Sequence, residues 1–271
     1  MSATPPERHA VTVQVDAGGT ASILGAELFT GGIDDLLTTI SALARSDRAH
    51  LVITPNVDQV LTLEDDPHAR ETFRAATLRI ADGAPVVALA RLLGARGIHR
   101  ITGTDLLRVA SARADALGWR IAVVGGSEDA LLALEPHDGV TVFRLPIIRD
   151  AREDDASLPA VRALHDFAPH LVFVCLGSPK QEFWFERWQD QLPPGVYVGA
   201  GAAVDFLAGV FRRAPRTLQV LGLEWAWRLA QEPRRLAHRY LVKGPRFVGV
   251  AARSLRAGRI ASPGASHRVR T

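Results

Sequence analysis

Short apolar runs alternate along the chain with longer segments in which apolar residues recur every three or four positions. An unbroken apolar run is typical of a strand buried on both faces, and the three-to-four spacing is typical of a helix packed against a sheet. The runs predict strands at residues 11–15, 23–24, 50–54, 78–80, 120–124, 140–145, 171–176 and 196–198. The helical spacing predicts helices at 33–43, through 60–63, at 85–93 and 103–117, from 128 onward, at 159–167 and through 184–188.

Strand and helix alternate at least five times with short connections, which predicts an α/β fold with a doubly wound, Rossmann-like parallel sheet. After Gly209 the strand pattern ends, and the rest reads as basic helices interrupted at Pro233 and at Gly244-Pro245. The pattern therefore divides the chain into a flexible N-terminus, a Rossmann-like domain, a basic helical C-terminal appendage and a disordered tail, at residues 1–20, 21–210, 211–260 and 261–271.

Charge is divided unevenly along the chain. Residues 211–271 hold 14 Lys and Arg against 2 Asp and Glu, and the remainder holds 18 against 27, so the overall charge of +3 is the sum of +12 and −9. A basic, amphipathic C-terminal part favours an anionic membrane surface as a partner. Two alternatives stay open, namely a helix packed on its own domain with a solvated basic face, and nucleic-acid binding, although no recognised nucleic-acid motif is present.

Several classes of site have no signal in the sequence. The single cysteine, Cys175, lies inside an apolar run, so it reads as a core residue and a disulfide within the chain is excluded. There is no CxxC pair, Asp-x-Asp pair at a strand end, histidine ligand pattern, Walker loop, dinucleotide fingerprint or Gly-x-Ser-x-Gly elbow. We therefore expect no metal and no cofactor, and also no signal peptide and no membrane span.

Three predicted strands run into glycine-containing turns that open helices. In the most informative of them, Ser178 is the expected N-cap and Gln181 completes a capping box. Helix N-termini carry free N–H groups and partial positive charge, which suit a phosphate, although ordinary tight turns explain any one of them equally well. The candidate binding residues of the three turns are Gly125, Gly126, Ser127, Gly177, Ser178, Pro179, Lys180, Gly201 and Asp205.

Other strand ends carry polar side chains. Asp82 follows an apolar strand directly and precedes Gly83, so it is a candidate general base, with a helix N-cap as the alternative. Thr54 and Asn56 are placed to orient a sugar hydroxyl, or to serve as cap and turn residues. Arg100 is either an anion contact or a surface charge.

These residues together resemble the WecG/TagA/CpsF family of glycosyltransferases over about 23–247. The ordered motifs that carry the resemblance are Thr54-Pro55-Asn56, Asp82-Gly83, Arg100-Ile101-Thr102-Gly103-Thr104-Asp105, Gly177-Ser178-Pro179-Lys180-Gln181-Glu182, Gly199-Ala200-Gly201-Ala202-Ala203-Val204-Asp205, Arg213-Ala214-Pro215, Gly222-Leu223-Glu224-Trp225 with Arg228, Glu232-Pro233 and Arg239-Tyr240-Leu241.

The resemblance implies an inverting, metal-independent transfer from a UDP-sugar to a polyprenyl-diphosphate-linked acceptor in cell-surface polysaccharide synthesis. It implies Asp82 as the base and a pocket lined by Thr54, Asn56, Arg100 and Gln181. It also implies that appendage arginines reach the donor diphosphate, with Arg228 and Arg235 at matching positions and Arg239 beside a third position at His238. The enzyme would then be cytoplasmic and peripheral on the inner face of the membrane.

The expected mechanism places the donor phosphates at the helix N-termini near Gly125-Gly126 and Ser178, with Asp82 deprotonating the acceptor hydroxyl. The two alternative functions are a nucleotide-binding oxidoreductase and a non-catalytic membrane-associated adaptor. The donor sugar, the acceptor, the polymer and a homo-oligomeric state are left open by the sequence.

Overall fold

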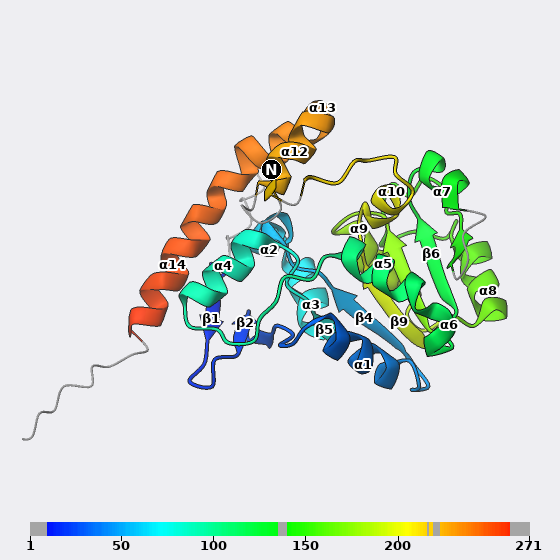
Figure 1. Ribbon diagram of the computed structural model, residues 1–271, viewed down its shortest axis with the longest axis horizontal. Helices are drawn as coiled ribbons and strands as arrows, with labels where there is room; N and C mark the ends of the chain where they lie inside the picture. Colours follow the sequence, from blue (N-terminus) through cyan, green and yellow to red (C-terminus); the bar gives the residue numbers. More distant parts are fainter. Residues whose placement is uncertain (1–9, 135–139, 216, 219–222, 261–271) are drawn as a thin grey trace, which may run out of the picture.

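A six-stranded, all-parallel sheet forms the centre of the computed structural model, which describes residues 10–134, 140–215, 217–218 and 223–260. The strands lie in the order β5-β4-β9-β8-β6-β7 (Figure 1). Their bounds are β4 Ala49–Ile53, β5 Leu78–Arg79, β6 Ile121–Gly125, β7 Val140–Phe143, β8 Leu171–Cys175 and β9 Gly195–Gly199. The doubly wound α/β fold predicted from the apolar pattern is thus confirmed.

Helices cover both faces of this sheet, so alternate residues of a strand enter two different cores. In β8, Leu171 and Phe173 pack into one core while Val172 and Val174 pack into the other, which explains the unbroken apolar run. One core is completed by α1 Ile33–Leu43, α5 Gly103–Ala112, α6 Ala114–Leu117, α7 Glu128–Leu134 and α10 Ala203–Leu207. The other is completed by α2 Val57–Asp65, α3 Pro67–Ala75, α4 Ala84–Leu92, α8 Leu158–Phe167 and α9 Lys180–Trp188.

The order of the strands creates a crevice beside β4. The chain leaves β4 toward β5 on one side, whereas β9 returns from β8 to pair with β4 on the other. The helices that follow β4 and β9 lie on opposite faces, because α2 packs in one core and α10 in the other. Turns that diverge in this way leave a crevice at the carboxyl edge, where ligands bind in sheets of this type.

Most predicted elements are present, with differences at their ends. Helix α6 ends at Gly118, whose φ of 64° is the left-handed conformation expected of a glycine stop. The helix α3 was not predicted, because Pro67 and charged residues interrupt its apolar spacing. Ser178 is not the N-cap of α9: that helix begins at Lys180 with Pro179 before it, and it has no side-chain cap.

A small antiparallel sheet precedes the main sheet and includes residues predicted to be flexible. It consists of β1 Val13–Val15, β2 Ala21–Ile23 and β3 Ala26–Glu27. Val11 and Val13 are completely buried, so the folded part starts well before residue 21. The predicted disordered tail, 261–271, and the first nine residues lie outside the described part of the chain.

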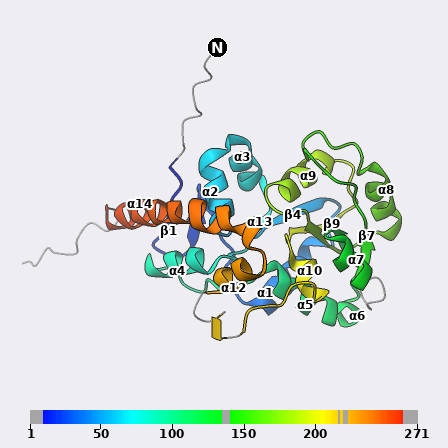
Figure 2. The ribbon, with the colours of Figure 1, turned by 90° about the horizontal axis from the view of Figure 1, so that it is seen from above.

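The C-terminal part is helical, as predicted. It comprises α12 Glu224–Gln231, α13 Pro233–Ala237, the π-helical turn η1 His238–Lys243, the 3₁₀ turn η2 Gly244–Arg246 and α14 Phe247–Ile260. Figures 1 and 2 place α14 at the end of the molecule opposite to α8, with α12 and α13 between them. There α14 packs against β1 and α2, and Ser254 Oγ accepts a hydrogen bond of 2.9 Å from the backbone N–H of Val13.

Ion pairs join the basic C-terminal part to the acidic helix α2. Arg246 pairs with Asp65 at 2.7 Å and lies 3.6 Å from Glu64, which also pairs with Arg253. About two turns earlier on the helix, Asp58 lies 3.3 Å from Arg239. Part of the positive charge of residues 211–271 is therefore used in ion pairs within the protein. This agrees with the alternative in which a basic helix packs on its own domain.

The contact between α14 and β1 yields a stability prediction. Val250 of α14 is completely buried, whereas Val248 on the same helix is 71% exposed. Val250→Ala should lower the free energy of unfolding by about 2 kcal/mol, because it removes buried apolar surface and leaves a cavity. Urea unfolding measures the change, with Val248→Ala as the matched control that should stay close to wild type. Equal stability of the two variants would contradict this packing.

Candidate active site

A cavity of about 330 Å³ lies at the crevice beside β4. Its floor comes from the turns after β4, β5 and β9 and from the start of α5, and its cover comes from the C-terminal helices. The residues that line it are Asn56, Val57, Asp58, Asp82, Gly83, Ala84, Pro85, Arg100, Thr102, Gly103, Thr104, Ala200, Ala202, Ala203, Phe206, Glu224, Trp225, Arg228, Arg239, Tyr240, Gly244, Phe247 and Val248.

The Asp82 carboxyl group faces this cavity from the turn between β5 and α4. The predicted alternative, an N-cap role, is wrong, because α4 is preceded by Gly83 and has no side-chain cap. The turn is fixed through its backbone instead, since Asp82 and Gly83 both donate to the carbonyl of Pro55, at 3.1 and 3.2 Å. The Asp82 side chain is therefore available for another role.

Burial raises the pKa of Asp82 to about 6. Arg100 and Arg228 lower this pKa, while the negative charges of Glu224 and Asp105 raise it further. A carboxyl group with this pKa is mostly ionised at neutral pH and still accepts a proton more readily than an ordinary aspartate does. Asp82 therefore has the protonation behaviour of a general base.

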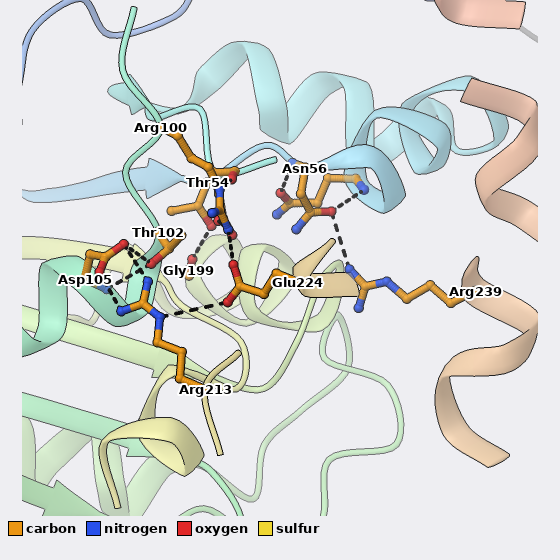
Figure 3. Close-up of polar contacts among 11 residues, drawn as sticks. Thr54, Asn56, Arg100, Thr102, Asp105, Gly199, Arg213, Glu224 and Arg239 are labelled. Carbon is orange, nitrogen blue, oxygen red and sulfur yellow. Dashed lines mark hydrogen bonds and ion pairs between the residues drawn. The ribbon is translucent and has the colours of Figure 1, made fainter. Parts of the chain in front are cut away.

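Arg100 bridges the turn of Asp82 and the C-terminal segment, and Figure 3 shows its guanidinium directed at Glu224. Its Nε donates a 2.7 Å hydrogen bond to the backbone carbonyl of Asp82, and its Nη2 donates one of 2.6 Å to Glu224. The same Nη2 atom is 4.0 Å from Asp82 Oδ1. Only about a quarter of the Arg100 side chain is exposed, so it belongs to the cavity and not to the outer surface.

A second arginine continues this line of charges. Arg213 binds Asp105 through two hydrogen bonds of 2.7 and 2.9 Å, and its Nε lies 3.9 Å from Glu224. Figure 3 shows the guanidinium groups of Arg100 and Arg213 directed toward Glu224 from opposite sides. Opposite charges thus alternate through Asp105, Arg213, Glu224 and Arg100 to the turn that carries Asp82.

Three members of this charge chain were not among the predicted site residues. Asp105, Arg213 and Glu224 all occur in the sequence motifs, so their residue types were visible. The sequence did not show which of these residues pair, because Asp105 and Arg213 are 108 positions apart and Arg100 and Glu224 are 124 positions apart. Only the fold brings them together.

Thr54 and Asn56 mainly organise the turns around the cavity. The Thr54 hydroxyl donates a 2.7 Å hydrogen bond to the carbonyl of Gly199 and so ties β4 to the end of β9. Asn56 Oδ1 caps α2 by accepting from the N–H groups of Asp58 and Gln59, as the cap alternative predicted. Asn56 also lines the cavity, where Arg239 donates to it at 3.4 Å.

Gln181 lies behind the cavity, 3% exposed, and supports one of its turns. Its Oε1 accepts a 2.9 Å hydrogen bond from the N–H of Gly201, and its Nε2 donates to Glu182 at 2.9 Å. Gln59 donates to the same Glu182 oxygen at 2.8 Å, and burial raises the pKa of Glu182. The predicted capping box is replaced by a contact that holds the β9–α10 turn.

The glycine turns divide into two groups. Gly83 lines the cavity, and a Cβ at this position would approach the Asn56 backbone to 2.9 Å, so two neighbouring turns meet closely here. The remaining predicted residues of the glycine turns do not line the cavity: Gly125, Gly126, Ser127, Gly177, Ser178, Pro179, Lys180, Gly201 and Asp205.

Several residues of that second group have structural partners instead. Ser127 hydrogen-bonds to Asp205, and Lys180 donates to the carbonyl of Ile148 at 2.9 Å. A Cβ at Gly126 would approach Val204 to 2.6 Å. Ser178 and Pro179 border a separate cavity of about 20 Å³.

The C-terminal helices contribute two arginines to the cavity, Arg228 and Arg239. The Arg228 guanidinium lies 5.1 Å from the centre of the Phe206 ring, and its Nε has no hydrogen-bond partner among the described residues. The side chain of Arg235 lies outside the described part of the structure. Arg228 and Arg239 are therefore the appendage arginines whose positions suit an anionic ligand.

The described residues contain neither a cluster of metal ligands nor a helix suited to cross a membrane. Within residues 10–134, 140–215, 217–218 and 223–260, no three His, Cys, Asp or Glu side chains gather as a set of metal ligands. None of the helices in the same ranges combines the length and the apolar character that crossing a membrane requires.

The raised pKa of Asp82 predicts a stability cost at neutral pH. Because its pKa rises from 3.8 in the unfolded chain to about 6 in the folded protein, stability falls as pH rises through this interval and stays lower above it. Asp82→Asn should therefore raise the free energy of unfolding at pH 7.5 by on the order of 2 kcal/mol, with the gain vanishing below about pH 4. Urea unfolding at several pH values tests this, and Asp190→Asn, at an exposed position, is the control. A gain that is independent of pH would contradict the assigned pKa.

The comparison with protein families gives one match over most of the chain. The model of the glycosyl transferase WecG/TagA/CpsF family matches residues 21–260, a span that includes the sheet, the cavity and the C-terminal helices. The resemblance inferred from the ordered motifs is thereby confirmed, and the reaction class is glycosyl transfer in cell-surface polysaccharide synthesis. This chain belongs to the WecG/TagA/CpsF family of glycosyltransferases.

Proposed function

We propose that the protein transfers a hexose or an N-acetylhexosamine from a UDP-sugar to a sugar linked to polyprenyl diphosphate, with inversion at the anomeric carbon. The observation that carries this proposal is the Asp82 carboxyl group in a cavity that two arginines of the C-terminal segment also line. Family membership supplies the reaction class.

In the proposed reaction, Asp82 is the general base. The acceptor hydroxyl oxygen attacks the anomeric carbon from the face opposite to UDP, and its proton passes to the Asp82 carboxylate. The bond between the anomeric carbon and the diphosphate oxygen breaks, and UDP leaves with the bonding electrons. The pKa of about 6 keeps Asp82 ionised before the transfer and able to hold the proton after it.

Positive charge for the leaving diphosphate is available on two sides of the cavity. Arg228 and Arg239 line it from the C-terminal helices. The N-termini of α2, α4 and α5 open into it from the sheet side, and helix N-termini favour anions. The proposal therefore assigns the diphosphate to these groups in place of the turns at Gly125-Gly126 and Ser178, and no metal ion is assigned a role. Arg235 stays a prediction.

Features of the outer surface support a peripheral position at the cytoplasmic face of the membrane. Leu241, Val242 and Val248 are 58%, 61% and 71% exposed, and Val248 lines the cavity. Lys243 provides positive charge in the same segment. An apolar and basic surface beside the cavity entrance suits an interfacial position, in which the lipid of the acceptor stays in the bilayer while its sugar reaches Asp82.

A panel of UDP-sugars tests the proposed donor class. We expect one UDP-hexose or UDP-N-acetylhexosamine to raise the melting temperature, and product analysis with a short-chain lipid-linked acceptor to show transfer. Asp82→Asn should lower turnover at least ~100-fold, as expected for loss of a general base, while UDP binding is retained. Near-wild-type turnover of this variant would remove Asp82 from the role. Stabilisation by NAD(P) alone would favour the oxidoreductase alternative, and the lack of any nucleotide binding would favour the adaptor.

The role of the C-terminal arginines is tested by a matched pair of substitutions. Arg228→Ala should lower kcat about 100-fold, because it removes a cation that stabilises developing charge on the diphosphate. Arg256→Ala removes the same charge from an exposed position of α14 and should leave kcat unchanged. Steady-state kinetics with the donor found above give the comparison, and similar kcat values for the two variants would contradict the assignment of Arg228.

A further inference from the structure

We propose that Glu224 is a positioning residue of the reaction, which holds the Arg100 guanidinium on the C-terminal side of the cavity so that Arg100 Nη2 stays 4.0 Å from the Asp82 carboxylate and makes no hydrogen bond to it. This inference rests on the proposed role of Asp82 as the base. It concerns a side chain that contacts Arg100 and lines the cavity but performs no step of the chemistry itself.

Two carboxylates, those of Glu224 and Asp82, lie near the Arg100 guanidinium. Its Nη2 atom is 2.6 Å from Glu224 Oε2 and 4.0 Å from Asp82 Oδ1. Its Nε is fixed to the backbone carbonyl of Asp82 at 2.7 Å, so the guanidinium is anchored beside the base whichever carboxylate it pairs with. Glu224 is the partner that it contacts in the structure, and without that carboxylate Asp82 is the nearest alternative among the described residues.

Glu224 is itself held in place from its other side. Its Oε1 lies 3.9 Å from Arg213 Nε, and the two terminal nitrogens of Arg213 are bound to Asp105. Only 16% of the Glu224 side chain is exposed. The carboxylate is therefore placed between two guanidinium groups, one of which is fixed to the start of α5.

This arrangement affects the base in two ways. A closer, hydrogen-bonded Arg100–Asp82 pair would lower the pKa of Asp82 further and would occupy an oxygen that has to accept the proton. The negative charge of Glu224 also acts on Asp82 and raises its pKa, as does that of Asp105, against the opposing effects of Arg100 and Arg228. Asp105 is paired with Arg213, so Glu224 is the acidic neighbour that also controls the position of Arg100.

Glu224 is the first residue of α12, and it therefore links the C-terminal segment to the chemistry. The turn that carries Asp82 belongs to the sheet, whereas the group that keeps Arg100 away from it arrives only when α12 lies over the cavity. The surroundings of Asp82 therefore depend on residues of both the sheet and the C-terminal segment.

The experiment compares Glu224→Gln with Glu71→Gln, which removes the same charge at an exposed position of α3. The pH dependence of kcat/KM should show an acid limb that reports Asp82. In Glu224→Gln this limb should move to lower pH by about one unit, and kcat at pH 7.5 should fall about tenfold because the base is weaker and partly covered. Glu71→Gln should match wild type, and Glu224→Asp, which keeps the charge, should restore part of the shift.

A second measurement does not depend on turnover. The ¹³C resonance of the Asp82 carboxyl, assigned by its absence in Asp82→Asn, should titrate at lower pH in Glu224→Gln than in wild type. In an Arg100→Gln background the additional effect of Glu224→Gln should be smaller, because the two residues act through one contact.

An unshifted Asp82 resonance together with an unshifted acid limb in a folded Glu224→Gln protein would overturn the inference. A failed proposed function looks different, since the wild-type protein would then transfer no sugar from any UDP-sugar while the Asp82 resonance still responded to Glu224→Gln.

Discussion

The cavity depends on ion pairs between two parts of the chain with opposite charge. Acidic side chains of α2 hold Arg239, Arg246 and Arg253. At the other edge, Glu224 and Asp105 hold Arg100 and Arg213. Several of these groups are half-buried, and pairs of this kind are costly to leave without a partner. The C-terminal helices thus cover the carboxyl edge of the sheet through specific contacts, and the cavity lies between these helices and the sheet.

The same contacts change the interpretation of the basic composition. In the sequence, the excess of arginine in residues 211–271 indicates an anionic partner. In the folded chain, acidic residues of the protein itself form ion pairs with part of these arginines. What remains for a ligand is more local: Arg228 in the cavity, Arg239, which Asp58 also contacts there, and basic residues such as Lys243 beside exposed apolar side chains.

The sequence predicted what depends on local pattern. Continuous apolar runs gave the strands because both faces of the sheet are buried, and Asp82 was identified as a candidate base from its place at a strand end. The predicted capping role of Gln181 was wrong, because its amide instead contacts Gly201 on the neighbouring turn. The Arg100–Glu224 contact could not be predicted, since residue types alone do not show which of many acids and arginines will meet.

The hydrogen bond between Val13 and Ser254 joins two residues 241 positions apart. A ribosome releases the chain from its N-terminus onward, so β1 is synthesised well before the helix α14 that it contacts. The β-sheet side of the cavity is complete long before its cover. The helices that cover the crevice, from Glu224 onward, are therefore added to the chain only after every strand of the main sheet has been made.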